Sequence, residues 1–344
     1  MSEQKVTSSA VAKRAGVSQS AVSRVFTPGA SASVATKEKV IKAASELGYR
    51  PNRLARGLIT GRTRMIGLVV AYLDNQFYPL ALEGLSQALQ EKGYHILVFM
   101  AKNTPASVTK VVQELIDYQV DGIIAASVAV SGDLAKRCAK AGIPIVLFNR
   151  GQDESKLSEV TSDNIAGGRS VANFLVAGGH KQIAHISGWQ GSSTGRDRAI
   201  GFTQALKLHG ITNIPLIDGM YDRQVAAQAT RDLFKARKKP DAIFVGNDHM
   251  AFAVMDVLRA DLNLSIPGDV SVIGYDDVPL AAWPSFNLTT VRQPLDQMVG
   301  TAVDLLMSSI DGLNESAAKI RIHGPLIVRQ SARIPKGDWN HEGL

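Results

Sequence analysis

From residue 65 onward, short apolar runs alternate with longer amphipathic stretches, and this alternation constrains the fold more than any other feature of the chain. Runs such as MIGLVVAYL, YHILVFMA, DGIIAAS and IPIVLFN are typical of strands buried on both faces of a parallel sheet. The stretches between them, such as YPLALEGLSQALQEKG, have helical spacing, so the repeated unit is strand, helix, strand. A second set runs from QIAHISG to VSVIGYDD. The sequence therefore predicts an α/β fold with two doubly wound parallel-sheet subdomains.

The first 50 residues predict three short helices instead, over about residues 8–15, 19–26 and 34–47. A hydroxyl side chain that can accept from the free backbone N–H groups precedes each helix: Thr7 or Ser8, then Ser18, then Ser33. Gly16 stands at the corner between the first two helices. This arrangement is typical of a helix-turn-helix, although many short helix pairs share such a turn.

The second of these helices has a polar outer face. If Val22 and Val25 face the core, then Gln19, Ser20 and Arg24 lie on the opposite side. Gln can bond the edge of adenine, Arg the edge of guanine, and Ser either one, in the major groove of DNA. We therefore predict that this helix reads base pairs.

The charge of the chain is concentrated in the same segment. Residues 1–64 contain 12 Lys or Arg and three Asp or Glu, out of 38 and 31 in the whole chain. The other 280 residues thus carry 26 basic and 28 acidic groups and are nearly neutral. A basic segment beside a neutral body is typical of a protein that binds a polyanion, and a solvated basic face without a partner is the alternative.

These patterns divide the chain into a head, a hinge and a body. The segment YRPNRLARGLITGRTR is basic, contains Pro and two Gly, and predicts a linker with one helical turn. We predict the following ranges: the DNA-binding head over 1–50, the hinge linker and hinge helix over 51–63, and the effector-binding and dimerisation body over 64–344, with one subdomain over about 64–163 plus 293–323 and the other over about 164–292 plus 324–335.

The head, hinge and body together resemble the lactose-repressor/galactose-repressor (LacI/GalR) family of bacterial transcription regulators. The resemblance is carried by VTSSAVAKRAGVSQSAVSRVF, TKEKVIKAASELGYRPNRLARGL, PIVLFNR, SDNIAGGRSVANFLVAGGHKQIAHISG, AIFVGNDHMAFAVMDVL, IPGDVSVIGYDD and NLTTVRQP. It covers about residues 5–335, with the order of the blocks kept. The chain departs from the commonest family pattern at Ala21, where Thr is frequent, so a phosphate contact from that hydroxyl is missing.

The resemblance implies a homodimer whose two heads bind a partly palindromic, double-stranded DNA operator. It also implies hinge helices, here Asn52 to Leu58, that meet in the minor groove, with Leu58 as the apolar wedge between base pairs and Ala55 beside the groove floor. The alternative for Leu58 is a contact with the body. Residues expected to contact DNA are Thr7, Ser18, Gln19, Ser20, Ser23, Arg24, Asn52, Arg53, Ala55 and Leu58.

A second site is expected in the body, because parallel-sheet proteins bind small ligands at the carboxyl ends of their strands. The family positions that match Arg198 and Asp276 hold sugar or base ligands, and Tyr221 matches an aromatic residue that stacks on the ligand. The expected ligand-binding residues are Asn75, Asn149, Arg150, Arg198, Tyr221, Asn247 and Asp276. Asn247 and Asp248 could instead cap the following helix, and Asp277 is expected to be structural.

The expected effector is a sugar, a sugar acid or a sugar phosphate. Arg150, Arg196 and Arg198 could together mark an anionic effector, because Arg binds carboxylate and phosphate with two parallel hydrogen bonds. The sign of the response, induction or co-repression, stays open.

The sequence offers little support for classes of function other than regulation. The segment GSSTG fits the nucleophile motif of hydrolases, but the preceding strand ends about four residues too early and no histidine stands in a triad context. The seven His residues have no metal-ligand spacing and no nucleotide-binding glycine loop follows a strand, so neither an enzyme activity, a metal nor a cofactor is expected. A periplasmic-type sugar-binding protein without DNA binding is the alternative, and a sensor with protein partners is less favoured.

A cytoplasmic location is expected for three reasons. The chain has no apolar run long enough to span a bilayer, so no membrane association is expected, and its first residues do not form a secretory signal. The single cysteine, Cys138, cannot form an intramolecular disulfide, which agrees with a reducing compartment.

Overall fold

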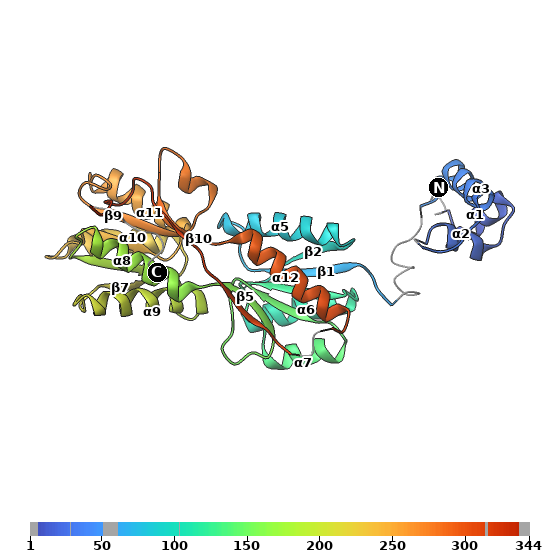
Figure 1. Ribbon diagram of the computed structural model, residues 1–344, viewed down its shortest axis with the longest axis horizontal. Coiled ribbons are helices and arrows are strands. Elements are labelled where there is room, and N and C mark those ends of the chain that lie inside the picture. Colours follow the sequence, from blue (N-terminus) through green and yellow to red (C-terminus); the bar gives the residue numbers. More distant parts are fainter. Residues whose placement is uncertain (1–5, 28, 51–60, 103, 314–315, 337–344) are drawn as a thin grey trace. The chain divides into compact units, whose positions relative to one another are not determined.

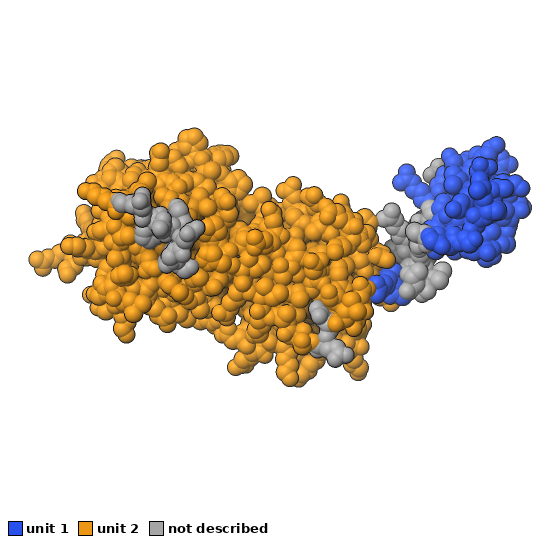
Figure 2. All heavy atoms as spheres, in the orientation of Figure 1, with its two compact units in different colours: residues 1–63 blue, residues 64–344 orange. Residues whose placement is uncertain are grey.

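The computed structural model describes residues 6–27, 29–50, 61–102, 104–313 and 316–336. The chain divides into two compact units, residues 1–63 and 64–344 (Figure 2). Each unit has its own hydrophobic core.

The first unit contains three helices around a small core: α1 (Ser8–Ala15), α2 (Gln19–Val25) and α3 (Val34–Leu47). The predicted caps Thr7, Ser18 and Ser33 are confirmed, since each side chain accepts a hydrogen bond from a backbone N–H in the first turn of its helix. Gly16 ends α1 with φ +65°, a left-handed conformation that suits glycine. The core consists of Val11, Ala12, Val22, Val40, Ala43 and Ala44.

The second unit consists of two subdomains, each with a six-stranded sheet between helices (Figure 1). The strands of the first subdomain are β1 (Met65–Val70), β2 (His95–Met100), β3 (Gly122–Ala126), β4 (Ile145–Phe148), β5 (Ser158–Ser162) and β11 (Lys319–Ile322). They are all parallel, in the order β11-β5-β4-β3-β1-β2. Buried residues of α5 (Phe77–Glu91) and α12 (Leu295–Ile310) pack on one face, and those of α6 (Pro105–Asp117) and α7 (Gly132–Lys140) pack on the other.

The second subdomain repeats this layered arrangement. Its strands are β6 (Ile183–Ser187), β7 (Leu216–Asp218), β8 (Ala242–Val245), β9 (Ser271–Asp276), β10 (Thr289–Arg292) and β12 (Leu326–Ile327). Their order is β12-β10-β9-β8-β6-β7, and β12 is antiparallel to β10 while the other pairs are parallel. Helices α8 (Asn164–Ala177) and α9 (Ser193–Leu208) cover one face, and α10 (Arg223–Lys235) and α11 (Asp248–Asp256) cover the other.

Short irregular helices and crossovers complete the second unit. Helix α11 continues into a π-helix, η1 (Val257–Asp261), and a 3₁₀ turn, η2 (Pro279–Ala282), follows β9. The chain passes between the subdomains after β5, after β10 and between β11 and β12. Among the described residues, no helix combines the length and the apolar character that crossing a membrane requires.

One strand differs from the sequence prediction. The run YHILVFMA was expected to be buried on both faces, but β2 is an edge strand, and Val98 and Met100 are 43% and 50% exposed. The apolar run alone does not distinguish an edge strand from a central one, because edge position depends on the order of the strands.

Most of the central strands correspond to the predicted apolar runs: β1, β3, β4, β6, β8 and β9. Five strands do not correspond to such a run, because they are short or polar: β5, β7, β10, β11 and β12. Thr289 and Thr290 of β10 are fully buried because their hydroxyls are hydrogen-bonded inside the protein.

Candidate functional site

The outer face of α2 is polar and exposed, as its sequence predicts. Gln19, Ser20, Ser23 and Arg24 are exposed, whereas Val22 is buried. Gln19 Nε2 donates to Ser8 Oγ at 2.9 Å. The guanidinium of Arg24 forms no hydrogen bond or ion pair with another described residue, and it lies on the exposed face of α2.

The other predicted DNA contacts fall into two groups. Thr7 and Ser18 are exposed at the amino ends of α1 and α2, where they also act as helix caps. Their hydroxyls and the first N–H groups of the helices lie at positions that suit phosphate contacts. The predicted hinge residues Asn52, Arg53, Ala55 and Leu58 lie outside the described residues.

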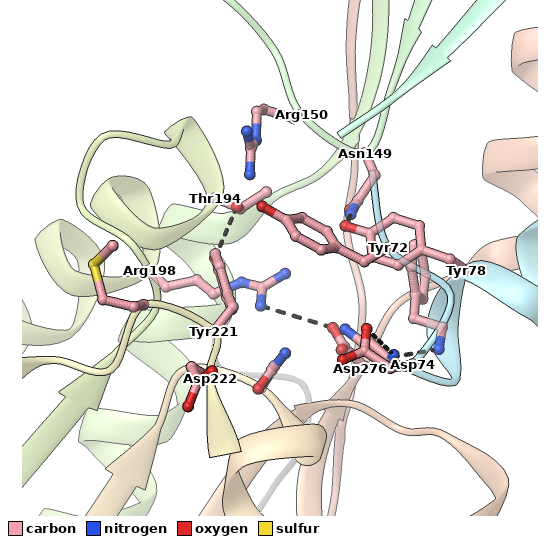
Figure 3. A pocket seen from close by; sticks show the side chains of 14 residues that line it. Tyr72, Asp74, Tyr78, Asn149, Arg150, Thr194, Arg198, Tyr221, Asp222 and Asp276 are labelled. Carbon is pink, nitrogen blue, oxygen red and sulfur yellow. Dashed lines mark hydrogen bonds and ion pairs between the residues drawn. The ribbon is translucent and has the colours of Figure 1, made fainter. Parts of the chain in front are cut away.

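The second candidate site is a cleft between the two subdomains of the body (Figure 3). It contains about 670 Å³ of space that protein atoms do not fill, a figure that includes open solvent at its mouth. All seven residues that the sequence analysis assigned to the ligand line this cleft: Asn75, Asn149, Arg150, Arg198, Tyr221, Asn247 and Asp276. They come from both subdomains, so a ligand in the cleft would touch both of them.

Arg198 lies at the centre of the cleft and is held from several sides. Its Nε donates to Asn164 Oδ1 at 2.8 Å and its Nη1 donates to the Gly246 carbonyl at 2.6 Å. The guanidinium lies 3.6 Å from the centroid of the Tyr275 ring, a cation–π contact. Nη1 also pairs with Asp276 at 3.7 Å. These contacts fix the guanidinium before any ligand arrives.

Asp276 is the buried partner of this arginine. Its Oδ1 accepts from Gln293 Nε2 at 2.7 Å. Burial raises the pKa of the Asp276 carboxyl to about 6, and the opposing effects of Arg198, Gln293 and Asn75 do not cancel this rise. Asp276 therefore titrates near physiological pH, unlike an exposed aspartate.

The pKa of Asp276 predicts a pH dependence of stability. Because the folded-state pKa is raised above the ordinary value near 3.9, the folded protein holds the proton more tightly than the unfolded chain. Its contribution to stability is therefore fully present below about pH 4, is lost as the pH rises to about 6, and amounts to about 3 kcal/mol. Asp276→Asn removes this titration. The free energies of unfolding of both proteins can be measured in urea from pH 4 to 7.5 by the fluorescence of Trp189 and Trp283. The difference between the two free energies should change within that pH window. A constant difference would contradict the assignment.

The first subdomain contributes a network of aromatic and polar side chains. Asn149 Nδ2 donates to the Tyr78 hydroxyl at 3.2 Å and lies 3.4 Å from Ser127 Oγ. Tyr78 and Ser127 are also hydrogen-bonded to each other. This network fixes Asn149 and leaves its Oδ1 without a partner among the described residues. A ligand hydroxyl could donate to that oxygen.

The second subdomain adds Thr194, Tyr221 and Asn247. Thr194 Oγ1 and the Tyr221 hydroxyl are hydrogen-bonded at 2.8 Å, which holds the ring of Tyr221 at the cleft. Asn247 accepts from the backbone N–H of Met250 and so caps α11, as the alternative interpretation proposed, while it also lines the cleft. The neighbouring Asp248 is buried behind the cleft, where it accepts from Val278 N and Thr290 Oγ1.

Several of these residues have left-handed backbones. The φ angles of Asn149, Tyr221 and Asp276 are +67°, +58° and +125°. Such conformations cost of order 1–3 kcal/mol each in non-glycine residues, and they gather at binding sites. Asp277, with φ +57°, pairs with Arg292 and Arg329 and is structural, as expected.

The three arginines that suggested an anionic ligand do not act together. Arg196 points to Asp153, with two hydrogen bonds of 2.6 and 3.0 Å, and to Asp197, and it does not line the cleft. Arg198 is committed to Asp276 and its other partners. Only Arg150 has buried donors without a partner among the described residues, at Nε and Nη1.

The cleft also contains residues that the sequence analysis did not assign to the ligand. These are Tyr72, Asp74, Phe77, Tyr78, Thr194, Met220 and Asp222. Thr194 lies within GSSTG, a segment in which the hydrolase motif indicates Ser193 as the candidate nucleophile. Ser193 opens α9 after a loop that follows β6, and its hydroxyl is buried without a hydrogen-bond partner among the described residues.

Two family models match the chain. Residues 9–52 match the model of bacterial regulatory proteins of the lacI family. Residues 172–332 match a periplasmic binding protein-like domain.

Curated relatives match over nearly the full length. The HTH-type transcriptional repressor PurR of Photobacterium profundum is 31% identical over 327 residues, which are 94% of this chain and 97% of that protein. The HTH-type transcriptional regulator CelR of Thermobifida fusca is 34% identical over 332 residues, which are 93% and 96%.

Solved structures of transcription regulators are also similar to this chain over nearly its full length. A lac repressor dimer bound to operator and the anti-inducer ONPF superposes with a TM-score of 0.86 at 27% identity, covering 95% of this chain and 99% of that one. A complex of the transcriptional regulator CelR with cellobiose has a TM-score of 0.71 at 32% identity and covers 95% and 100%.

Proposed function

This chain belongs to the lacI family of bacterial regulatory proteins, and from that membership we propose that it acts as a dimeric repressor of transcription whose operator binding is controlled by a sugar or sugar derivative. The observation that carries the proposal is the joint presence of an exposed polar α2 and a cleft lined by all seven expected ligand residues. The full-length relatives named as repressors, and the solved complexes with operator and with cellobiose, support it.

The head would bind the operator through α2. Gln19, Ser20 and Arg24 reach base edges in the major groove, while Thr7 and Ser18 at the helix ends contact phosphates. Asn52, Arg53, Ala55 and Leu58 would contact DNA from the hinge. A gel shift with DNA from upstream of the regulated genes, with and without sugars, tests the proposal, and absence of DNA binding at low ionic strength would refute it.

Substitutions in the head should separate base reading from phosphate binding. Arg24→Ala and Gln19→Ala should each weaken the preferred operator about 5- to 150-fold (about 1–3 kcal/mol) and relax the preference at one base position, because each removes a contact to a base edge. Lys37→Ala, at an exposed position on α3, is the matched control and should weaken all sequences alike and reduce the salt dependence. Equal losses on every operator variant for all three proteins would exclude this division of roles.

The effector would act by changing how the two subdomains of the body are arranged. A ligand in the cleft touches both of them, and the crossovers that join them can accommodate a hinge motion. In a dimer this motion would change the spacing of the two hinges. A coupling of about 1–3 kcal/mol would change operator affinity roughly 5- to 150-fold, and the arrangement that the ligand prefers decides between release and recruitment.

We also propose that the chain is not an enzyme and that it acts in the cytoplasm, where DNA-binding regulators work. The isolated Ser193 hydroxyl supports the first point, because a serine nucleophile needs a neighbouring base. The relatives named as DNA-binding regulators support the second.

A further inference from the structure

We infer that the natural effector carries a carboxylate that binds Arg150, so that the ligand is a sugar acid rather than a neutral sugar. This inference rests on the proposed function and names the chemistry of its effector. It is carried by one buried cation in the cleft that the protein itself does not neutralise.

Arg150 follows β4 and lines the cleft with only 5% of its surface exposed. Its guanidinium lies 5.4 Å from the centroid of the Trp189 ring, across the cleft in the second subdomain. This cation–π contact orients the guanidinium but satisfies no N–H group. Both Nε and Nη1 are buried and have no hydrogen-bond partner among the described residues. A buried charged donor without a partner is costly, so the site favours a ligand that supplies an acceptor.

Two acidic residues close to Arg150 in the sequence, Asp153 and Glu159, are engaged elsewhere. Asp153 binds Arg196 through both carboxylate oxygens. Glu159 accepts from the backbone N–H of Gln152 at 3.0 Å and lies 4.0 Å from Lys319 Nζ. No carboxylate among the described residues forms an ion pair with Arg150, so a ligand carboxylate would supply the counter-charge that this part of the chain lacks.

The rest of the cleft fits the remainder of such a ligand. Figure 3 shows Arg150 on one side of the cleft and Asp222 and Asp276 toward the other. Asp74 and Asn247 also line it. Carboxylates accept hydrogen bonds from hydroxyl groups, and amides both accept and donate them, so this side suits a polyhydroxy chain or ring. The polarity of the cleft therefore matches a molecule with an acidic group at one end and hydroxyls at the other.

A carboxylate fits better than a phosphate. Arg150 is the one cation of the cleft's described lining without a protein partner, because Arg198 is paired with Asp276. One guanidinium balances the single negative charge of a carboxylate. A phosphate, with up to two charges, would also meet three aspartates in the same cleft, Asp74, Asp222 and Asp276.

Calorimetry on the full-length protein, in a buffer free of carboxylate and phosphate, tests the inference. The probes are matched sets of five- and six-carbon sugars: aldonic and uronic acids, the corresponding neutral aldoses and alditols, and the corresponding sugar phosphates. At least one acid should bind about 10- to 100-fold more tightly than its neutral counterpart, the range expected for a charge-assisted pair. In Arg150→Gln this preference should disappear, and Arg150→Lys should restore part of it.

Arg196→Gln is the matched control, since Arg196 is another arginine near the cleft but is paired with Asp153 and Asp197. It should keep the preference for the acid. Three results would overturn the inference: a neutral sugar that binds as tightly as its acid, a sugar phosphate that binds more tightly than the acid, or a panel in which no acid binds. Operator binding, measured separately without ligand, tests the proposed function. A failure of the carboxylate inference is therefore distinguishable from a failure of the proposed function.

Discussion

Arg198→Met is expected to destabilise the body of the protein by about 3–5 kcal/mol and to weaken effector binding at least about 10-fold. The first effect arises because the side chain is 97% buried. Its removal leaves Asn164 Oδ1 and the Gly246 carbonyl without their donor and the buried Asp276 without its counter-charge. The second arises because the guanidinium lies in the centre of the cleft. Urea unfolding measures the first effect and calorimetry with the tightest-binding sugar or sugar acid measures the second.

Arg196→Met is the control for this substitution. Arg196 is two residues earlier on α9 and also pairs with carboxylates, but its side chain is 39% exposed. Exposed ion pairs contribute about 0–1 kcal/mol, so the control should unfold almost like the parent protein. If both substitutions lowered the free energy of unfolding equally, burial would not explain why the Arg198–Asp276 pair stabilises the protein.

Gly168→Ala should be strongly destabilising, with a cost of about 3 kcal/mol or more. A Cβ atom at Gly168 of α8 would lie 2.2 Å from the Arg198 carbonyl oxygen and 2.9 Å from Phe202 N, both in the backbone of α9. Backbone atoms cannot turn aside as a side chain can, so the two helices would have to separate. That movement would also displace Arg198, so loss of stability and loss of effector affinity should appear together in unfolding and calorimetric measurements.

A second glycine provides a matched control, for which the expected change in stability has the opposite sign. Gly300 lies inside α12, and a Cβ there would have no neighbour within 4 Å. Gly300→Ala should stabilise the protein by about 0.5–1 kcal/mol, because alanine favours the helix. A similar change in stability for both substitutions would contradict the role of close helix packing at Gly168.

The sequence predicted the head and the layered body well because their signals are local. Ser18 before Gln19 and Gly16 before Val17 specify a cap and a turn within a few residues. Runs such as MIGLVV specify buried strands by their composition. Composition wrongly predicted that β2 is buried on both faces, because an exposed edge depends on which strands become neighbours. Composition also missed β10, whose polar Thr290 is buried because it donates to Asp248, which is distant in the sequence.

Part of the cleft could also be predicted. Asn149, Asn247 and Asp276 directly follow apolar runs, and the end of a parallel strand is where ligands bind. Tyr78 was missed because its helical spacing in α5 makes it look like a core residue, and it is indeed buried while it contacts Asn149. Met220 follows the three-residue strand β7, which is too short to be recognised from composition. The unpaired state of Arg150 could not be predicted, since it depends on where Asp153 and Glu159 find partners.

The interleaved order of the strands also affects how the protein forms during synthesis. The last strand of the first sheet, β11, comes from residues 319–322, although its neighbour β5 ends at residue 162. On the ribosome, the amino-terminal half of the body therefore emerges well before the strand that covers its edge. Until translation is almost finished, β5 is an open edge that other chains can pair with, which makes nascent or truncated forms of this protein prone to aggregate.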